Sequence, residues 1–190
     1  MTPSPRKATG SLVVISGPSG SGKTTICRRL VEHPGVEMSV SATTRGQRAA
    51  EVDGRDYWFL DADEFERRVR AGDFLEHAEY NGNRYGTLRS EVEARLGAGK
   101  TVILEIEVQG TRQLQQHGVQ AIYLFVMPPS PEELERRLRD RHTEDDATIR
   151  RRLRIAREEM DMAHLYDHVI VNDDLEGAVR TALQYIGVPA

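Results

Sequence analysis

The sequence is poor in cysteine and has no excess of positive charge. Its single cysteine, Cys27, excludes an internal disulfide and a multi-cysteine zinc site, and it suits a reducing compartment. The 26 lysine and arginine residues are outnumbered by 30 aspartate and glutamate residues, which gives a formal charge of −4. Because nucleic-acid binders are usually basic, we expect no nucleic-acid polymer as a partner.

Long hydrophobic runs are also absent. The longest ones, residues 12–15 and 121–127, are far too short to cross a bilayer. Residues 1–10 are polar and lack the apolar segment of a signal peptide, so we expect a flexible tail there. We therefore expect a cytoplasmic protein without membrane association. Its 190 residues are enough for one domain that folds without disulfides or a structural metal.

What the chain does contain is an alternation of short apolar runs and amphipathic stretches. Four runs are typical of buried strands, at residues 12–15, 101–104, 122–126 and 169–171. Helical patterns accompany them at residues 23–32, 108–117, 131–139, 147–164 and 175–186. This alternation predicts an α/β fold in which helices flank a parallel sheet.

Two segments interrupt the alternation. The first contains a helical pattern at 64–70, an apolar run at 74–80, a turn signal at Asn81-Gly82 and a returning strand at 84–87. We interpret it as a small, mixed, largely antiparallel insertion on the parallel sheet. The second, which begins near Arg136, is crowded with arginine residues that are offset by acids.

A phosphate-binding loop is the clearest motif. Residues 17–24 fit the pattern G-x-x-x-x-G-K-[ST] and stand between a buried strand and a helix, which argues against a coincidental glycine-rich turn. Backbone N–H groups in such a loop form an anion cradle at a helix N-terminus. Lys23 adds a cation for the phosphates, and the Thr24 hydroxyl can bind Mg²⁺. The predicted nucleotide contacts are Gly17, Pro18, Ser19, Gly20, Ser21, Gly22, Lys23, Thr24 and Thr25.

Two carboxylates follow the strand at 101–104. Glu105 and Glu107 are two residues apart, so they point to one face at the carboxyl end of the strand, where ligands of parallel sheets bind. They are either candidates for the metal region or two solvated acids.

A second anion site is indicated by Arg45 and Arg48, because arginine suits a bidentate clamp on phosphate. Tyr57 and Tyr85, in the same irregular segment, could add hydroxyl donors. Two phosphate sites in one domain suggest a donor triphosphate and an acceptor monophosphate.

If the acceptor is a nucleotide, polar groups must recognise its base. Guanine presents N1–H and N2–H₂ donors, which call for a carboxylate, and an O6 acceptor, which calls for a donor. Glu76 could supply the carboxylate, and Ser41 and Thr87 could supply hydroxyls.

The sequence resembles the guanylate kinase family over residues 10–186. The matching motifs are Ser16-Gly17-Pro18-Ser19-Gly20, Ser39-Val40-Ser41-Ala42-Thr43-Thr44-Arg45, Glu51-Val52-Asp53-Gly54, Phe74-Leu75-Glu76, Tyr85-Gly86-Thr87, Val108-Gln109-Gly110 and Val171-Asn172-Asp173-Asp174. The resemblance implies a P-loop nucleoside monophosphate kinase that transfers the γ-phosphoryl group of ATP to GMP with Mg²⁺. It implies a core at about 11–36, 98–135 and 165–186, a GMP-binding insertion at about 37–97 and a helical lid at about 136–164.

The resemblance also implies residue roles. The GMP phosphate would be held by Arg45, Arg48, Tyr57 and Tyr85, and guanine would be recognised by Ser41, Glu76 and Thr87. Glu105 would lie in the acceptor and metal region, and Asn172 near the adenine of ATP. Two lid arginines map to Arg141 and Arg152, which would bring positive charge to the transferred group. The expected catalytic residues are Lys23, Arg45, Arg48, Arg141 and Arg152.

Three other functions compete with this one. A catalytically inactive guanylate-kinase-like module would bind phosphorylated peptides, but it would have no need for Lys23 and Thr24. A P-loop kinase with a non-guanine acceptor, such as a ribose phosphate, would have no need for Glu76. A GTPase is disfavoured because the N-K-x-D motif is missing. A homo-oligomer is compatible with the sequence.

Overall fold

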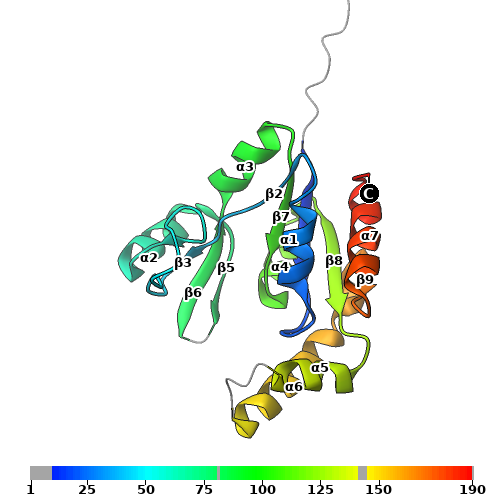
Figure 1. Ribbon diagram of the computed structural model, residues 1–190. Coiled ribbons are helices and arrows are strands. Elements are labelled where there is room, and N and C mark those ends of the chain that lie inside the picture. The colour runs from blue at the N-terminus through cyan, green and yellow to red at the C-terminus, as the bar shows by residue number, and fades with distance from the viewer. Residues whose placement is uncertain (1–9, 81, 141–144, 190) are drawn as a thin grey trace, which may run out of the picture.

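The computed structural model describes residues 10–80, 82–140 and 145–189, and a five-stranded parallel sheet forms its centre (Figure 1). Its strand order is β2-β7-β1-β8-β9, and every neighbouring pair is parallel. These strands are β1 (Leu12–Ser16), β2 (Val36–Met38), β7 (Thr101–Glu105), β8 (Ile122–Met127) and β9 (His168–Val171). The four predicted strands and the α/β fold class are therefore confirmed, but β9 is an edge strand in which Val169 and Val171 are exposed, so it is not buried as expected.

Helices pack on both faces of this sheet, which explains why its three central strands, β7, β1 and β8, are largely apolar. The helical elements are α1 (Lys23–Leu30), α2 (Ala62–Ala71), α3 (Arg89–Gly97), α4 (Val108–Gln116), α5 (Pro131–Arg139), α6 (Asp146–Met160), the 3₁₀ turn η1 (Ala163–Leu165) and α7 (Leu175–Ile186). Residues of α1 and α7 join Val13 and Ile15 in one core, whereas residues of α3 and α4 join Val14 in the other. Cys27 is fully buried in the first core, as expected for a small core residue.

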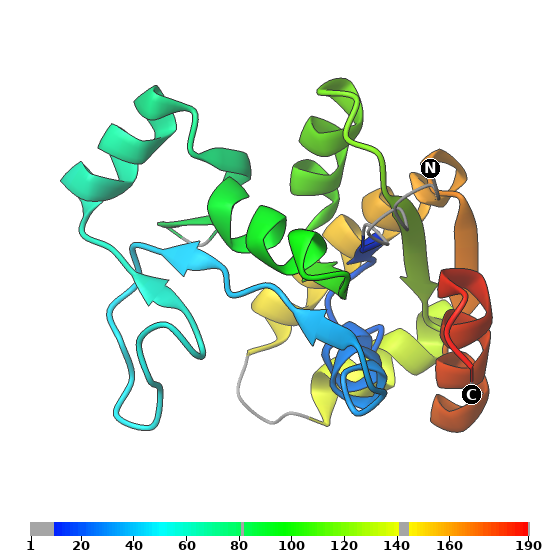
Figure 2. The ribbon, with the colours of Figure 1, turned by 90° about the horizontal axis from the view of Figure 1, so that it is seen from above.

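A smaller sheet lies beside the large one, on the side away from α7 (Figures 1 and 2). It has the order β4-β3-β6-β5, with β3 (Ala42–Thr43), β4 (Trp58–Phe59), β5 (Phe74–Tyr80) and β6 (Asn83–Leu88). Both β3 and β5 run antiparallel to β6, while β3 and β4 are parallel, so the predicted mixed sheet is confirmed. Phe65 of α2 stacks on Phe74, with ring centroids 4.6 Å apart, and closes a small core of its own.

Several elements were not expected from the sequence, among them β2, α3 and the two-residue strands β3 and β4. β2 is only three residues long and pairs with β7, so the expected boundary between residues 36 and 37 falls inside a strand of the large sheet. α3 buries one residue, Val92, and therefore lacks the apolar stripe that identifies a helix in sequence. The helical pattern expected to run to residue 164 ends at Met160 and is followed by η1.

Helices α5 and α6 form the lid segment, which extends from the sheet beyond the end of β8 (Figure 1). Ser130 caps α5 by accepting from the Glu133 N–H, and Asp145 caps α6 by accepting from the Thr148 N–H. The two helices share a small core of Leu134, Leu138, Leu153 and Ala156. The predicted lid residue Arg141 lies outside the described residues, as do residues 1–9 of the expected tail. No helix in the described part of the chain is long and apolar enough to span a bilayer.

Candidate active site

The phosphate loop links the end of β1 to the start of α1 and depends on glycine for its shape. Gly22 directly precedes α1 with φ 96°, a conformation that favours glycine. A methyl group at this position would also lie 2.2 Å from Asn172 Nδ2, so there is no space for a side chain. Because no side chain caps α1, the first N–H groups of the helix are available for an anion.

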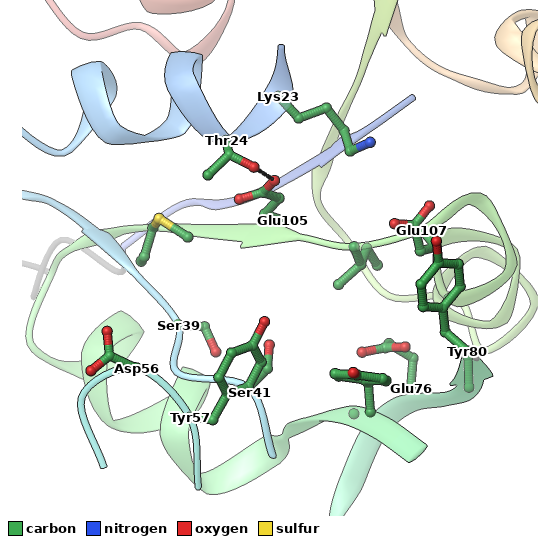
Figure 3. Close-up of a pocket in the computed structure, with 16 residues that line it drawn as sticks. Lys23, Thr24, Ser39, Ser41, Asp56, Tyr57, Glu76, Tyr80, Glu105 and Glu107 are labelled. Atoms are coloured by element: carbon green, nitrogen blue, oxygen red, sulfur yellow. Dashed lines mark hydrogen bonds between the residues drawn. The ribbon is translucent and has the colours of Figure 1, made fainter. Parts of the chain in front are cut away.

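The two reactive side chains of the loop have defined partners. Lys23 is buried, and its Nζ donates to the carbonyl oxygens of Gly17 and Pro18, at 2.5 and 3.2 Å. Thr24 Oγ1 donates to Glu105 Oε1 at 2.5 Å (Figure 3). Thr24, the residue predicted to bind Mg²⁺, therefore lies beside the Glu105 carboxylate at the end of β7. Thr24 and Thr25 are both exposed at the start of α1.

Asn172, which follows β9, supports the phosphate loop. Its side-chain Nδ2 donates to the backbone carbonyl oxygen of Ser21 at 2.7 Å, and its backbone carbonyl oxygen accepts from Arg137 Nη2 at 3.0 Å. The lid segment thus contacts the base of the loop through Arg137, a contact that the sequence did not indicate. The expected contact of Asn172 with adenine stays a prediction.

A cleft of about 370 Å³ separates the phosphate loop from the small sheet (Figure 3). Figure 3 shows Lys23, Thr24 and Glu105 on one side of it, and Ser41, Tyr57 and Glu76 on the other. The cleft therefore joins the nucleotide loop to the segment in which an acceptor was expected. The predicted residues that line it are Lys23, Thr24, Ser41, Tyr57, Glu76, Tyr85 and Glu105.

Glu76 is a buried carboxyl group in the wall of the cleft, with only 5% of the residue exposed. Thr87 Oγ1 donates to Glu76 Oε1 at 2.7 Å. Burial raises the pKa of Glu76 to about 6, and the hydrogen bonds from Thr87 oppose that rise. At pH 7 the group is thus mainly an ionised acceptor. Thr87 itself does not line the cleft, and its expected contact with a base stays a prediction.

Arg45 is held by Glu51, a residue for which no role was expected from the sequence. Glu51 Oε1 and Oε2 accept from Arg45 Nη2 and Nη1, at 2.7 and 3.0 Å, and Oε2 also accepts from the Arg48 backbone N–H at 2.8 Å. These bonds, chiefly the one from Arg45, lower the pKa of the Glu51 carboxyl. The Arg45 guanidinium lies 5.3 Å from the Tyr57 ring centre, and the Tyr57 and Tyr85 rings are 6.1 Å apart. Three of the four predicted phosphate contacts are therefore gathered at the cleft.

The remaining predicted arginines are placed differently. Arg48 is exposed, with 74% of its side chain accessible, and only approaches Glu51 at 4.0 Å. Arg45, Arg48 and Arg152 do not line the cleft; Arg152 is half-buried on α6. Glu159 of α6 lies in a separate hollow beside α4. Burial first, and then the Glu107 carboxylate, raise the pKa of Glu159 to about 7, and Lys23 opposes that rise.

Sequence reasoning also missed lining residues of the cleft, among them Asp56, Tyr80 and Gly110. The sequence marked Gly110 only as part of the family motif Val108-Gln109-Gly110. The contacts that explain this glycine appear only in the folded chain. Taken together, the phosphate loop, two phenol rings and a buried carboxylate line one cleft, and Arg45 lies beside one of the phenol rings. This arrangement suits transfer of a phosphoryl group between two bound nucleotides.

Comparison with known proteins identifies the family. The family model described as guanylate kinase matches residues 9–187. The guanylate kinase of Prochlorococcus marinus is 49% identical over 173 residues, covering 90% of this chain and 92% of that protein. The guanylate kinase of Synechocystis sp. is 45% identical over 188 residues, covering 98% of each. The crystal structure of guanylate kinase from Anaplasma phagocytophilum superimposes with a TM-score of 0.75 at 34% identity, covering 95% of this chain and 86% of that one. The chain belongs to the guanylate kinase family.

Proposed function

We propose that this chain transfers the γ-phosphoryl group of ATP to GMP, giving ADP and GDP, with ATP on the phosphate loop and GMP in the adjoining cleft. Family membership over nearly the whole chain supports the reaction. The cleft supports the placement of the substrates, because it runs from Lys23 and Thr24 to the small sheet. Catalysis would rest on positioning and electrostatic stabilisation, without a covalent intermediate.

The proposal that GMP is the acceptor rests mainly on Glu76. A buried carboxylate that lines a cleft has to be matched by hydrogen-bond donors of the ligand, because an unpaired buried charge is costly. Guanine offers such donors in N1–H and N2–H₂, whereas N1 of adenine is an acceptor and would face the carboxylate unfavourably. Ser41, which also lines the cleft, would donate to O6.

The GMP phosphate would bind at the arginine end of the cleft. Arg45 is preorganised there because Glu51 holds both of its terminal nitrogens. Tyr57 and Tyr85 line the cleft beside it and would add hydroxyl donors. Arg48 would complete the clamp from its exposed position, and this would require its side chain to turn toward the phosphate.

Thr24 and Glu105 fit a Mg²⁺ ion bound together with ATP. Both offer oxygen ligands, and their side-chain oxygens are already adjacent. No group of three or more histidine, cysteine or acidic residues that could hold a metal occurs within the described ranges, so the phosphates would supply further ligands, as is usual for Mg²⁺. The ion would neutralise charge on the phosphates of the donor.

The lid segment would close over the donor nucleotide. Arg152, and Arg141 from the part of the chain not described, would then place positive charge against the transferred group. Closure would exclude water, so that the phosphoryl group reaches GMP. We assign the three units close to the bounds expected from the sequence: core at about 11–36, 98–135 and 165–186, acceptor insertion at about 37–97, and lid at about 136–164. The first boundary moves to the end of β2 at Met38, because β2 belongs to the large sheet.

A coupled assay of ADP release tests this function against the alternatives. Purified protein with Mg²⁺ and ATP is offered GMP, AMP, CMP or UMP in turn, and we expect rapid ADP release with GMP alone. Activity with AMP but not with GMP would contradict the assignment of Glu76. If ATP binds in a Lys23-dependent manner but no acceptor supports ADP release, a phosphopeptide-binding role is favoured instead.

A further inference from the structure

Gly110 has no role in the function proposed so far, although it lines the cleft. It lies in the first turn of α4, directly against the Glu76 carboxyl group. A methyl group at position 110 would lie 2.4 Å from Glu76 Oε2 and 3.1 Å from Glu76 Cδ. The first distance is shorter than carbon and oxygen can approach without displacement. The carboxylate therefore occupies the space that any larger residue at position 110 would fill.

The Glu76 side chain cannot easily move aside. Its other oxygen, Oε1, is held by the Thr87 hydroxyl at 2.7 Å, and the residue is 5% exposed. Its backbone is also fixed, because Glu76 pairs with Thr87 where β5 runs antiparallel to β6. A shift of Oε2 would therefore break the bond to Thr87 or push the carboxylate into the cleft.

The helix cannot easily retreat from Glu76 either. Gln113, one turn after Gly110 on α4, binds the backbone of His77, the neighbour of Glu76 on β5. Gln113 Nε2 donates to the His77 carbonyl oxygen at 2.7 Å, and Gln113 Oε1 accepts from the His77 N–H at 3.1 Å. This pair fixes the position of α4 along β5 and brings Gly110 opposite Glu76.

We propose that Gly110 is a positioning residue for guanine recognition: by lacking a side chain, it lets the first turn of α4 and Thr87 hold the Glu76 carboxylate between them in one orientation. Gly110 does not itself bind a polar group of the base. The inference rests on the function proposed above and adds a specificity-determining position to the acceptor site.

The variant Gly110→Ala tests this directly. To reach an ordinary carbon–oxygen contact, Oε2 must move by about 1 Å, which is enough to lose a charge-assisted hydrogen bond to the base. We expect the KM for GMP to rise by roughly ten- to a hundredfold, while the KM for ATP stays within about twofold of the wild type. Gly97→Ala is the matched control, because Gly97 ends α3 with open space around it, and this variant should leave both constants unchanged.

A double-mutant cycle separates this role from a general effect on folding. If Gly110 acts through the carboxylate, then Gly110→Ala should have little further effect on GMP in the Glu76→Gln background. Equal effects in both backgrounds, or an unchanged KM for GMP in Gly110→Ala, would overturn the inference. A wild-type protein that fails to phosphorylate GMP would instead contradict the proposed function before any variant is compared.

A second variant covers the case in which Gly110→Ala does not fold. Gln113→Ala adds no atoms near Glu76 but removes both hydrogen bonds between α4 and His77. It should raise the KM for GMP by several-fold, with the KM for ATP unchanged. If this variant folds and its KM for GMP equals that of the wild type, the position of α4 does not control the carboxylate and the inference is wrong.

Discussion

The buried carboxyl group of Glu76 predicts a pH dependence for the use of GMP. Burial raises its pKa from the ordinary 4.5 to about 6. Only the ionised form offers acceptors alone and makes charge-assisted hydrogen bonds with the N–H donors of guanine, because the protonated form carries an O–H donor of its own. The value of kcat/KM for GMP reports groups of the free enzyme, so it should be high at pH 7 and above and fall as the pH drops through 6. At pH 5 about one-tenth of the Glu76 groups would be ionised, which gives a loss of about tenfold from this cause.

The phosphate group of GMP also titrates near this pH, since phosphate monoesters have a second pKa of about 6. Glu76→Gln separates the two effects, because the substrate titrates identically with both enzymes. We expect the variant to lose roughly ten- to a hundredfold in kcat/KM for GMP at pH 7, with the KM for ATP almost unchanged. The assay is kcat/KM for GMP between pH 5 and 8 at saturating Mg²⁺ and ATP. The kcat/KM of the wild type divided by that of the variant should decrease by about tenfold from pH 7 to pH 5. A ratio independent of pH would refute the assignment.

The same pKa predicts a gain in stability for Glu76→Gln. A carboxyl group whose pKa is raised by folding favours the folded state only when protonated, so its contribution becomes unfavourable as the pH rises from 4.5 through 6. The difference between the two pKa values, 4.5 and about 6, corresponds to a destabilisation of the folded state by about 2 kcal/mol at pH 7. The neutral amide can still accept from Thr87, so the free energy of unfolding in urea should rise by up to about 2 kcal/mol at pH 7 and be unchanged near pH 4. A destabilised variant at pH 7 would show that burial does not penalise this carboxylate.

Other residues give further predictions. Lys23→Ala should reduce kcat by on the order of a thousandfold, because it removes the cation of the phosphate loop; normal turnover would contradict the assignment of that loop. Glu51→Gln should raise the KM for GMP by about tenfold, since it weakens the bidentate hold on Arg45, and Glu51→Asp should recover part of the loss; a KM for ATP that rises equally would argue for general misfolding. Arg152→Ala should lower kcat by about a hundredfold with a much smaller change in nucleotide binding measured by calorimetry, whereas equal losses in both would place Arg152 in binding rather than in the transfer step.

The fold could be predicted where burial leaves a pattern in the sequence. Strands buried on both faces appear as continuous apolar runs, and such runs predicted β1, β7 and β8. β9 is also an apolar run, although at the edge of the sheet it buries only Ile170. β2 could not be predicted because three residues are too few to show a hydrophobic period, and because its second residue, Glu37, is polar. α3 could not be predicted because it buries only Val92 and therefore shows no apolar stripe in the sequence. β2 owes its conformation mainly to its pairing with β7, which lies far away in sequence.

The site could be predicted where its chemistry is contiguous in the chain. The phosphate loop is one such stretch, and its position between β1 and α1 is as expected. The roles of Glu51 and Gly110 were hidden, because each depends on a contact that only the folded chain makes. Gly110 matters through a carboxylate 34 positions away, and a sequence shows only a glycine within a helix. Thr87 likewise holds Glu76 instead of lining the cleft.

The most direct test of the central claim is the product balance of a single incubation. Wild-type protein is mixed with Mg²⁺ and equimolar ATP and GMP, and the nucleotides and inorganic phosphate are resolved by anion-exchange chromatography. Transfer between two nucleotides in one cleft predicts one GDP for every ADP formed, without release of inorganic phosphate. ADP that accumulates with inorganic phosphate in place of GDP would mean that water is the acceptor, and it would contradict the claim that GMP occupies the cleft beside the phosphate loop.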